Sequence, residues 1–194
     1  MYQERIYRTY CNSELNAERI VVDETDLLIN YNNSINGLEN CLIDIRKTIK
    51  DQIDNENHFL TSLEPIDSAS NEPRIIQHMK SASNQYGVGP MAAVAGAISD
   101  YIAKDYIKDN TDLIIENGGD IFIKTSKERH ILIHAGDSQL SDRISIKITP
   151  EMTPIGVCTS SGKLGHSLSF GKADAVVVVA KDILYAVAAA SAYK

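Results

Sequence analysis

The sequence predicts an α+β fold in which helices pack on a mixed, mostly antiparallel sheet. The chain has 194 residues, of which 43% are hydrophobic and 23% are charged, enough apolar material for one well-buried core. Extended β-branched runs alternate with segments of helical period. An Asn-Gly-Gly-Asp turn at residues 117–120 joins two apolar runs. We therefore expect residues 1–194 to form one domain, with a hairpin and helix over residues 1–60 and a motif-bearing core over residues 73–192.

The N-terminal part of the chain predicts a hairpin followed by a helix. Residues 4–9 and 19–30 alternate β-branched and aromatic residues with charges, and residues 23–26 supply a turn. From Leu38 onward, apolar residues recur at i, i+3, i+4, i+7 and i+11, which places one apolar stripe along a helix. Cys41 lies on that stripe, so we expect it to be a packing residue.

Two further helices are predicted after a polar surface connection at residues 55–71. Pro73 opens the first of them. His78 lies beside its apolar stripe and is expected to pack, because no second metal ligand follows at i+4. The next helix covers residues 91–108. Its alanines and Gly96 leave so little side-chain bulk that another backbone must approach it closely.

The C-terminal part predicts three more strands and a last helix. Strand-like runs cover residues 129–134, 143–149 and 173–180. The last run has no polar alternation, so we expect a central strand that is buried on both faces. Asp182 is expected to cap a final helix over residues 183–192, whose alanines again require close packing.

Charge and hydropathy exclude two classes of partner. The formal net charge is −7 and no cluster of Lys and Arg offsets it locally, so we expect no binding to nucleic acid or to an anionic membrane surface. Residues 1–10 lack the apolar segment of a secretion signal, and the longest apolar stretch is far shorter than the ~20 residues that cross a bilayer. We therefore expect a cytoplasmic location. The cysteines, Cys11, Cys41 and Cys158, stand at irregular spacings that argue against a disulfide framework.

Glycine-rich turns supply a candidate anion cradle. The glycines concerned are Gly87, Gly89, Gly118 and Gly119. The first two precede a helix whose dipole favours an anion, and the other two expose backbone N–H groups between Asn117 and Asp120. The alternatives are structural: a tight start of the helix in the first case and an ordinary type I′ hairpin in the second. The residue types leave both alternatives open.

Residues 154–171 gather a thiol, hydroxyls, an imidazole and a lysine within an apolar neighbourhood. Cys158 is a candidate nucleophile whose pKa Lys163 or His166 would lower, and His166 is also a candidate acid, base or anion contact. The alternative for Cys158 is a core residue at the end of a strand, which the frequent burial of free cysteine favours. The remaining candidate ligand contacts are Thr159, Ser160, Ser161 and Gly162.

Several of these motifs together resemble the ApbE-like superfamily, whose best-known members are magnesium-dependent FAD:protein FMN transferases. The resemblance spans roughly residues 85–192. Gly96 and Asp100 fit a Lys-Gly helix motif in which Ala95 replaces the lysine, and residues 117–121 and 159–162 are similar to Asn-Ala-Gly-Gly-Asp-Ile and Thr-Ser-Gly. The run Gly-Val-Cys-Thr-Ser-Ser-Gly followed by Gly-His-Ser-Leu-Ser-Phe-Gly more closely resembles a small cytoplasmic branch of the superfamily, catalogued as proteins of unknown function.

The resemblance implies an ApbE-like fold and a flavin ligand, FAD or FMN. It also implies a magnesium site, but the position of one aspartate ligand falls on Val187 in this chain. Valine cannot ligate a hard cation, which requires oxygen donors. This difference argues against a metal ligand set here and against flavin transfer itself.

Three functional hypotheses follow from the sequence. The first is a protein that binds a phosphorylated or flavin-type small molecule in a glycine-rich pocket, with Asp120 and His166 as polar or catalytic contacts. The second is a cysteine-dependent, sulfur-handling enzyme in which Cys158 is the nucleophile. The third is a non-catalytic relative that acts as an oligomer, for which we expect a homodimer. The residues identify neither a substrate nor a reaction.

Overall fold

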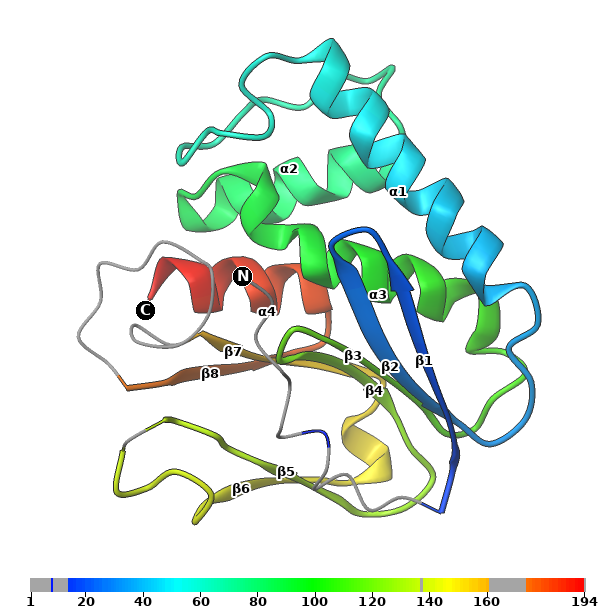
Figure 1. The fold of residues 1–194 in the computed structure, drawn as a ribbon. Coiled ribbons are helices and arrows are strands. Elements are labelled where there is room, and N and C mark those ends of the chain that lie inside the picture. Colours follow the sequence, from blue (N-terminus) through cyan, green and yellow to red (C-terminus); the bar gives the residue numbers. More distant parts are fainter. Residues whose placement is uncertain (1–7, 9–13, 137, 161–173, 194) are drawn as a thin grey trace.

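A six-stranded sheet lies at the centre of the molecule, with helices on one face and a small two-stranded sheet on the other (Figure 1). The structure is a computed structural model that describes residue 8 and residues 14–136, 138–160 and 174–193. Every pairing between neighbouring described strands is antiparallel. The predicted α+β class, a mostly antiparallel sheet packed with helices, is confirmed.

The strands of the large sheet follow the order β1-β2-β3-β4-β7-β8. In that order they are β1 (Asn16–Val22), β2 (Thr25–Tyr31), β3 (Leu113–Asn117), β4 (Asp120–Lys124), β7 (Ile155–Ser160) and β8 (Val176–Ala180). The small sheet pairs β5 (Arg129–Leu132) with β6 (Ser145–Ile148). The side chains of the large sheet alternate between two apolar clusters, because successive residues of a strand point to opposite faces. Cys158 therefore belongs to the cluster beneath the helices and Val157 to the cluster facing the small sheet.

Four α-helices and two short 3₁₀ helices complete the described fold. They are α1 (Leu38–Asn55), α2 (Arg74–Tyr86), η2 (Pro90–Ala93), α3 (Val94–Tyr106), η3 (Pro150–Met152) and α4 (Ile183–Ala192). The α3 and α4 helices lie next to the sheet, and α2 lies on their far side (Figure 1). The predicted helix over residues 91–108 is a 3₁₀ turn followed by α3, which ends at Tyr106.

The predicted N-terminal hairpin is formed by β1 and β2. Its turn is the pair Asp23 and Glu24, and Asp23 adopts a left-handed φ of 51°. The strands on either side of this turn pair over their whole length, from Asn16 with Tyr31 to Val22 with Thr25. Of the run at residues 4–9, the structure describes only residue 8.

Glycines allow α4 to pack closely on both the sheet and α3, as the alanine-rich sequence predicts. A Cβ atom at Gly156 of β7 would lie 2.5 Å from the Ile183 Cα atom, and one at Gly96 of α3 would lie 3.0 Å from the Ile183 carbonyl oxygen. The first distance leaves no room for a side chain unless the helix shifts, and the second is tighter than ordinary packing. The side chain of Asp182 accepts a hydrogen bond from the Leu184 N–H over 2.9 Å, which confirms the predicted cap of α4.

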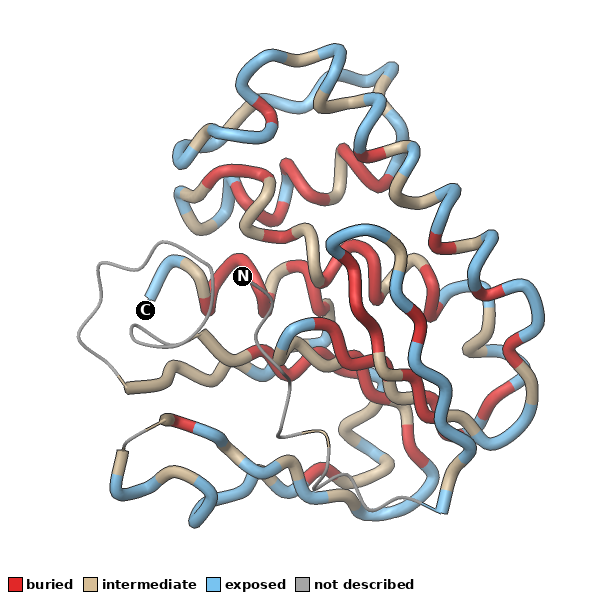
Figure 2. The backbone as a smooth tube through the Cα atoms, viewed as in Figure 1, coloured by how far each residue is buried: buried red, intermediate tan, exposed pale blue. Residues whose placement is uncertain are grey.

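The prediction that residues 173–180 form a central strand is wrong. In the described structure β8 is the end strand of the large sheet, and its residues are mostly half-buried rather than buried (Figure 2). Val177 packs against the cluster facing the small sheet, whereas Val178 packs against the cluster beneath the helices. The apolar run thus reflects layers above and below β8, and it does not require a neighbouring strand on each side.

The connection at residues 55–71 is anchored more firmly than its polar sequence predicts. Phe59 is fully buried. Nearby, the buried Lys80 of α2 places its Nζ 2.8 Å from Glu56 Oε2, and the same Nζ also pairs with Glu72. A buried charge requires such partners. This cluster therefore fixes the end of α1 and the connection against α2.

Candidate functional site

The predicted turn between β3 and β4 brings several candidate residues to one end of the large sheet. It is a two-residue turn in which Gly118 and Gly119 have φ values of 67° and 98°, and Asn117 pairs with Asp120 across it. Such positive φ values are the reason for glycine here. The register of β4 on β7 pairs Ile121 with Val157, so Asp120 lies beside Cys158 on the neighbouring strand.

A hydrogen bond to α3 places this end of the sheet within the fold. The Asn117 side-chain amide donates to the Ala95 carbonyl over 3.2 Å, which joins the turn to the first residues of α3. Beyond Cys158, the half-buried Thr159 and Ser160 complete β7. We call this region, made of residues 117–120, 159 and 160, the sheet-end site. The structure therefore brings Asn117, Gly118, Gly119, Asp120, Thr159 and Ser160 together.

A carboxylate of the chain itself accepts the hydrogen bond of one of the glycine N–H groups. The Gly119 N–H donates to Glu116 Oε1 over 2.8 Å. Glu116 is buried and pairs in turn with Arg8, whose Nη1 lies 2.7 Å from Asp26 Oδ1. The turn is consequently not an open anion cradle, because an internal anion already accepts this hydrogen bond. No local sequence pattern indicates this arrangement, since Arg8 and Asp26 are far from Glu116 along the chain.

The other predicted part of the cradle, Gly87 and Gly89, lies elsewhere. Gly87 ends α2 in a left-handed conformation, and its N–H donates to carbonyls of that helix. A Cβ atom at Gly89 would lie 1.8 Å from the Ser62 carbonyl oxygen, so this glycine is required by the packing of the connection against η2. In Figure 1, α4 separates the link between α2 and η2 from the sheet. The structure does not bring these two glycines to the sheet-end site.

The surroundings of Cys158 disfavour the predicted nucleophile. The side chain is fully buried, and its Sγ lies 3.9 Å from the Ile183 carbonyl oxygen. Burial, together with the nearby Asp120 carboxylate, raises the pKa of Cys158 well above its ordinary value. The thiol is therefore protonated at neutral pH. Cys158 is therefore a core residue near the end of a strand, which is the alternative that the frequent burial of free cysteine favours.

Four candidate residues, Ser161, Gly162, Lys163 and His166, lie outside the described residues. Cys41, predicted to pack in the core, is half-buried, and its Sγ donates to Asp105 Oδ2 over 3.2 Å. Burial first, and then this carboxylate, raise the pKa of Cys41 to about 12. Cys41 is therefore also a protonated thiol at neutral pH.

The position expected for a magnesium ligand belongs to the apolar core. Val187 is buried at 5% exposure, and its Cγ2 would lie 3.0 Å from a Cβ atom at Gly96. The residues that the structure describes contain no group of three or more His, Cys, Asp or Glu side chains arranged to hold a metal ion. A hard cation requires several oxygen ligands. The described residues at this position therefore do not fit magnesium.

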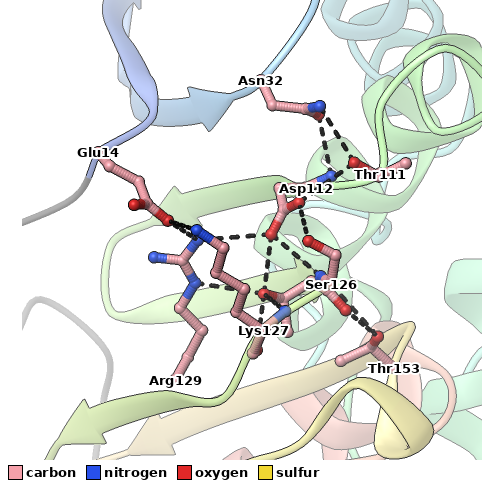
Figure 3. Close-up of polar contacts among 9 residues, drawn as sticks. Glu14, Asn32, Thr111, Asp112, Ser126, Lys127, Arg129 and Thr153 are labelled. Carbon is pink, nitrogen blue, oxygen red and sulfur yellow. Dashed lines mark hydrogen bonds and ion pairs between the residues drawn. The ribbon is translucent and has the colours of Figure 1, made fainter.

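A polar cluster around Asp112, which the sequence did not reveal, lies at the opposite end of β3 and β4 (Figure 3). Asp112 accepts hydrogen bonds from the backbone and side chain of Ser126 and from the Thr125 hydroxyl. Burial opposes ionisation, but these hydrogen bonds outweigh it and lower the pKa of Asp112 to about 2. Arg129 Nη2 lies 3.4 Å from the same carboxylate. The cluster joins the start of β3 to the segment between β4 and β5, which is a structural role.

Comparison with known proteins agrees with this fold. A family model described as "AbpE bacteria" matches residues 8–193. A UPF0280 protein of Methanococcus maripaludis is 38% identical over 179 residues, which cover 90% of this chain and 72% of that protein. The chain belongs to the ApbE-like superfamily, in the branch of the UPF0280 proteins. A second member of this branch, from Methanococcus aeolicus, is 40% identical over the same shares of the two chains.

Solved structures of ApbE proteins share the fold at low sequence identity. The apo form of the flavinyl transferase ApbE of Pseudomonas stutzeri has a TM-score of 0.53 and 12% identity, covering 92% of this chain and 83% of that one. The flavin transferase ApbE of Vibrio cholerae has a TM-score of 0.54 and 13% identity, covering 91% and 86%. These likenesses establish the ApbE-like fold. In the described part of this ApbE-like chain, no helix has the length and apolar character needed to span a bilayer.

Proposed function

We propose that the chain binds a small molecule of flavin or related phosphorylated type at the sheet-end site. The observation that carries this proposal is the gathering of Asn117, Asp120 and Ser160 on three adjacent strands, on the face of the sheet that also carries Cys158. Amide, carboxylate and hydroxyl groups that converge from neighbouring strands can fix the orientation of a ligand. The flavin transferases that share this fold support a flavin as the first ligand to test.

The charges at the site indicate which part of such a ligand the turn would hold. Asp120 stands beside the turn, and Glu116 already accepts the Gly119 N–H. Carboxylates accept hydrogen bonds from hydroxyl groups and repel a phosphate. We therefore assign the hydroxyl-bearing chain of a flavin to the turn. The hydroxyl of Ser160, two residues from Cys158 and on the same face of β7, can donate a hydrogen bond, so a phosphate or a ring carbonyl belongs at the end of β7.

Magnesium-dependent flavin transfer is not part of this proposal. Val187 packs against Gly96 where a cation ligand would be needed. Cys158 does not replace the metal as a catalytic group, because its buried thiol stays protonated at neutral pH. The proposed activity is therefore ligand binding, and no covalent step is assigned to the described residues.

Fluorescence titrations of riboflavin, FMN and FAD test the proposal. We expect saturable binding, and we expect Asp120→Asn to weaken it about tenfold, which corresponds to about 1.4 kcal/mol. Asp142→Asn is a matched control, because Asp142 lies in the segment between β5 and β6 and has a side chain that is 47% exposed. Failure of all three flavins to bind at millimolar concentration would exclude a flavin ligand. Equal affinity of the Asp120 and Asp142 variants would exclude the sheet-end site.

A homodimer is a second candidate, favoured by the exposure of β8. Val179 is 40% exposed on this end strand of the described sheet, and an apolar end strand is a surface on which another strand can pair. We propose a second copy of the chain as the partner. Light scattering of the purified protein should then give a dimer mass that Val179→Lys lowers. A monomer mass for the unmodified chain would rule the dimer out.

A further inference from the structure

An open surface depression lies on the side of the α3 and α4 layer that faces away from the sheet. Its volume is about 510 Å³, and its lining residues are Ser68, Arg74, Gln77, His78, Ser81 and Tyr101. We call it the α2 groove. All six lining residues carry a polar group, and three of them, Ser68, Arg74 and Ser81, are exposed to solvent. The α2 groove is thus distinct from the sheet-end site, from which the α3 and α4 layer separates it (Figure 1).

The helical period of α2 creates the polar wall of this groove. Arg74, Gln77, His78 and Ser81 stand at i, i+3, i+4 and i+7, which places them on one face of the helix. The opposite face carries the buried Ile75, Ile76 and Met79. Burial of that apolar face therefore fixes the direction in which the polar face points.

His78 is held in place by the start of α4. Its Nε2 lies 2.8 Å from Asp182 Oδ2, and the other oxygen of Asp182 accepts the Leu184 N–H. The second ring nitrogen, Nδ1, lies 3.9 Å from Asp100 Oδ2, which is too far for a hydrogen bond. Among the residues that the structure describes, none forms a hydrogen bond with His78 Nδ1. One side of an oriented imidazole is thus left to accept or donate a hydrogen bond.

Two carboxylates beside the groove already have partners within the chain. Asp100 pairs with Lys104 over 2.6 Å, and Asp182 pairs with His78. Arg74 is exposed, and its guanidinium forms no ion pair or hydrogen bond within the described part of the chain. The groove therefore contains one guanidinium without an ion-pair partner among the described residues, although the whole chain carries a net charge of −7.

We propose that the α2 groove binds the phosphate group of a phosphomonoester. A guanidinium presents two parallel N–H groups that match two phosphate oxygens. His78 supplies a further polar contact next to Arg74 on the same face of α2. The Ser81 hydroxyl, 3.0 Å from the Tyr185 hydroxyl, adds a polar group at the edge of the groove, whereas the Ser68 hydroxyl already donates to Glu72 Oε2. A single carboxylate would use fewer of these groups, which favours phosphate.

The size of the groove leaves room for the organic part of such a ligand. Pockets of roughly 300–1,000 Å³ accommodate small molecules, and the volume here is about 510 Å³. Tyr101 provides an aromatic surface in the lining, with Lys104 Nζ 4.0 Å from the ring centroid. A phosphomonoester with a planar organic group therefore fits both the charge and the lining of the groove.

Calorimetric titration with phenyl phosphate and with inorganic phosphate at low ionic strength tests this proposal. We expect both to bind, with phenyl phosphate the tighter of the two. Arg74→Gln should weaken binding at least tenfold, and Arg74→Lys should weaken it less, because the charge is kept and the planar fork is lost. The matched control is Arg143→Gln, since Arg143 is another exposed arginine. It should bind like the unmodified chain.

The same titrations define the results that would overturn the proposal. The proposal is wrong if phosphate does not bind at about 10 mM, an approximate upper limit for a specific anion site. It is also wrong if the Arg74→Gln and Arg143→Gln variants bind with equal affinity. A third contrary result is that benzoate binds as tightly as phenyl phosphate. Because Arg74 is exposed, its variants should keep the melting temperature of the unmodified chain. Asp120→Asn should leave phenyl phosphate binding unchanged, which separates this proposal from the sheet-end site.

Discussion

Asp182 joins the start of α4 to His78 of α2 with its two carboxylate oxygens. Oδ1 accepts the Leu184 N–H over 2.9 Å, and Oδ2 lies 2.8 Å from His78 Nε2. One side chain thereby caps one helix and connects it to another. Because α4 also packs on β7, this contact links the outer helix α2 to the layer that covers the sheet.

Removal of the Asp182 side chain should destabilise the fold through both contacts. We expect Asp182→Ala to lower the free energy of unfolding by about 2 kcal/mol, because a lost N-cap and a lost charged hydrogen bond each contribute about 1 kcal/mol. Asp182→Asn keeps a capping oxygen and should cost less. Urea denaturation measures both variants. A change below about 0.5 kcal/mol in the alanine variant, as for an ordinary surface substitution, would refute the double role.

Acid should destabilise the protein partly through Asp112. The pKa of this carboxyl is lowered in the folded state to about 2 from an ordinary value of 3.8, so its contribution is present above pH 3.8 and is lost as the pH falls towards 2. The shift corresponds to about 2 kcal/mol. Asp112→Asn should therefore flatten the fall in stability with pH in this range. The same slope in this variant and in the Asp142→Asn control would contradict the assignment.

Close packing of β7 on α4 should make Gly156 intolerant of substitution. A Cβ atom there would lie 2.5 Å from the Ile183 Cα atom, so Gly156→Ala should lower stability by about 3 kcal/mol. Gly87→Asn is the control, because a Cβ atom at Gly87 meets nothing within 4 Å and asparagine tolerates its left-handed φ. Thermal melting compares the two. Similar melting temperatures would show that the helix can move away from the strand.

Alkylation should reveal Cys158 as an unreactive thiol. Burial and the Asp120 carboxylate raise its pKa well above the ordinary value, and only the thiolate reacts with iodoacetamide. We expect the residue to remain unmodified at pH 7.5 and to be labelled rapidly once urea unfolds the chain. Peptide mass spectrometry after timed quenching provides the measurement. Rapid labelling of the folded protein would restore the hypothesis of a cysteine-dependent enzyme.

The periodic elements of this fold were predictable from the sequence because their signals are local. The stripe that begins at Leu38, the turn at residues 117–120 and the cap at Asp182 each depend on residues within a few positions of one another. The place of β8 was not predictable in this way. An apolar run indicates that both faces of the sheet are covered at that strand, but it does not indicate which strands pair with it on either side.

The candidate site was predicted in part for the same reason. Residues 117–120 and 159–160 meet because adjacent strands carry them. Glu116 accepts the hydrogen bond of the Gly119 N–H and pairs with Arg8. No local sequence pattern indicates the contact between Arg8 and Glu116, because the two residues are far apart along the chain. The polar face of α2 was visible as a spacing, but its function as a groove depends on α3 and on the connection before α2.

Backbone amide NMR during a riboflavin titration tests the central claim most directly. The sheet-end site predicts that saturating riboflavin shifts the amide signals of Gly118, Gly119 and Thr159, while those of α1 stay in place. Loss of these shifts in Asp120→Asn would strengthen the assignment. Absence of any shift at saturation, or shifts confined to the residues around Arg74, would contradict it.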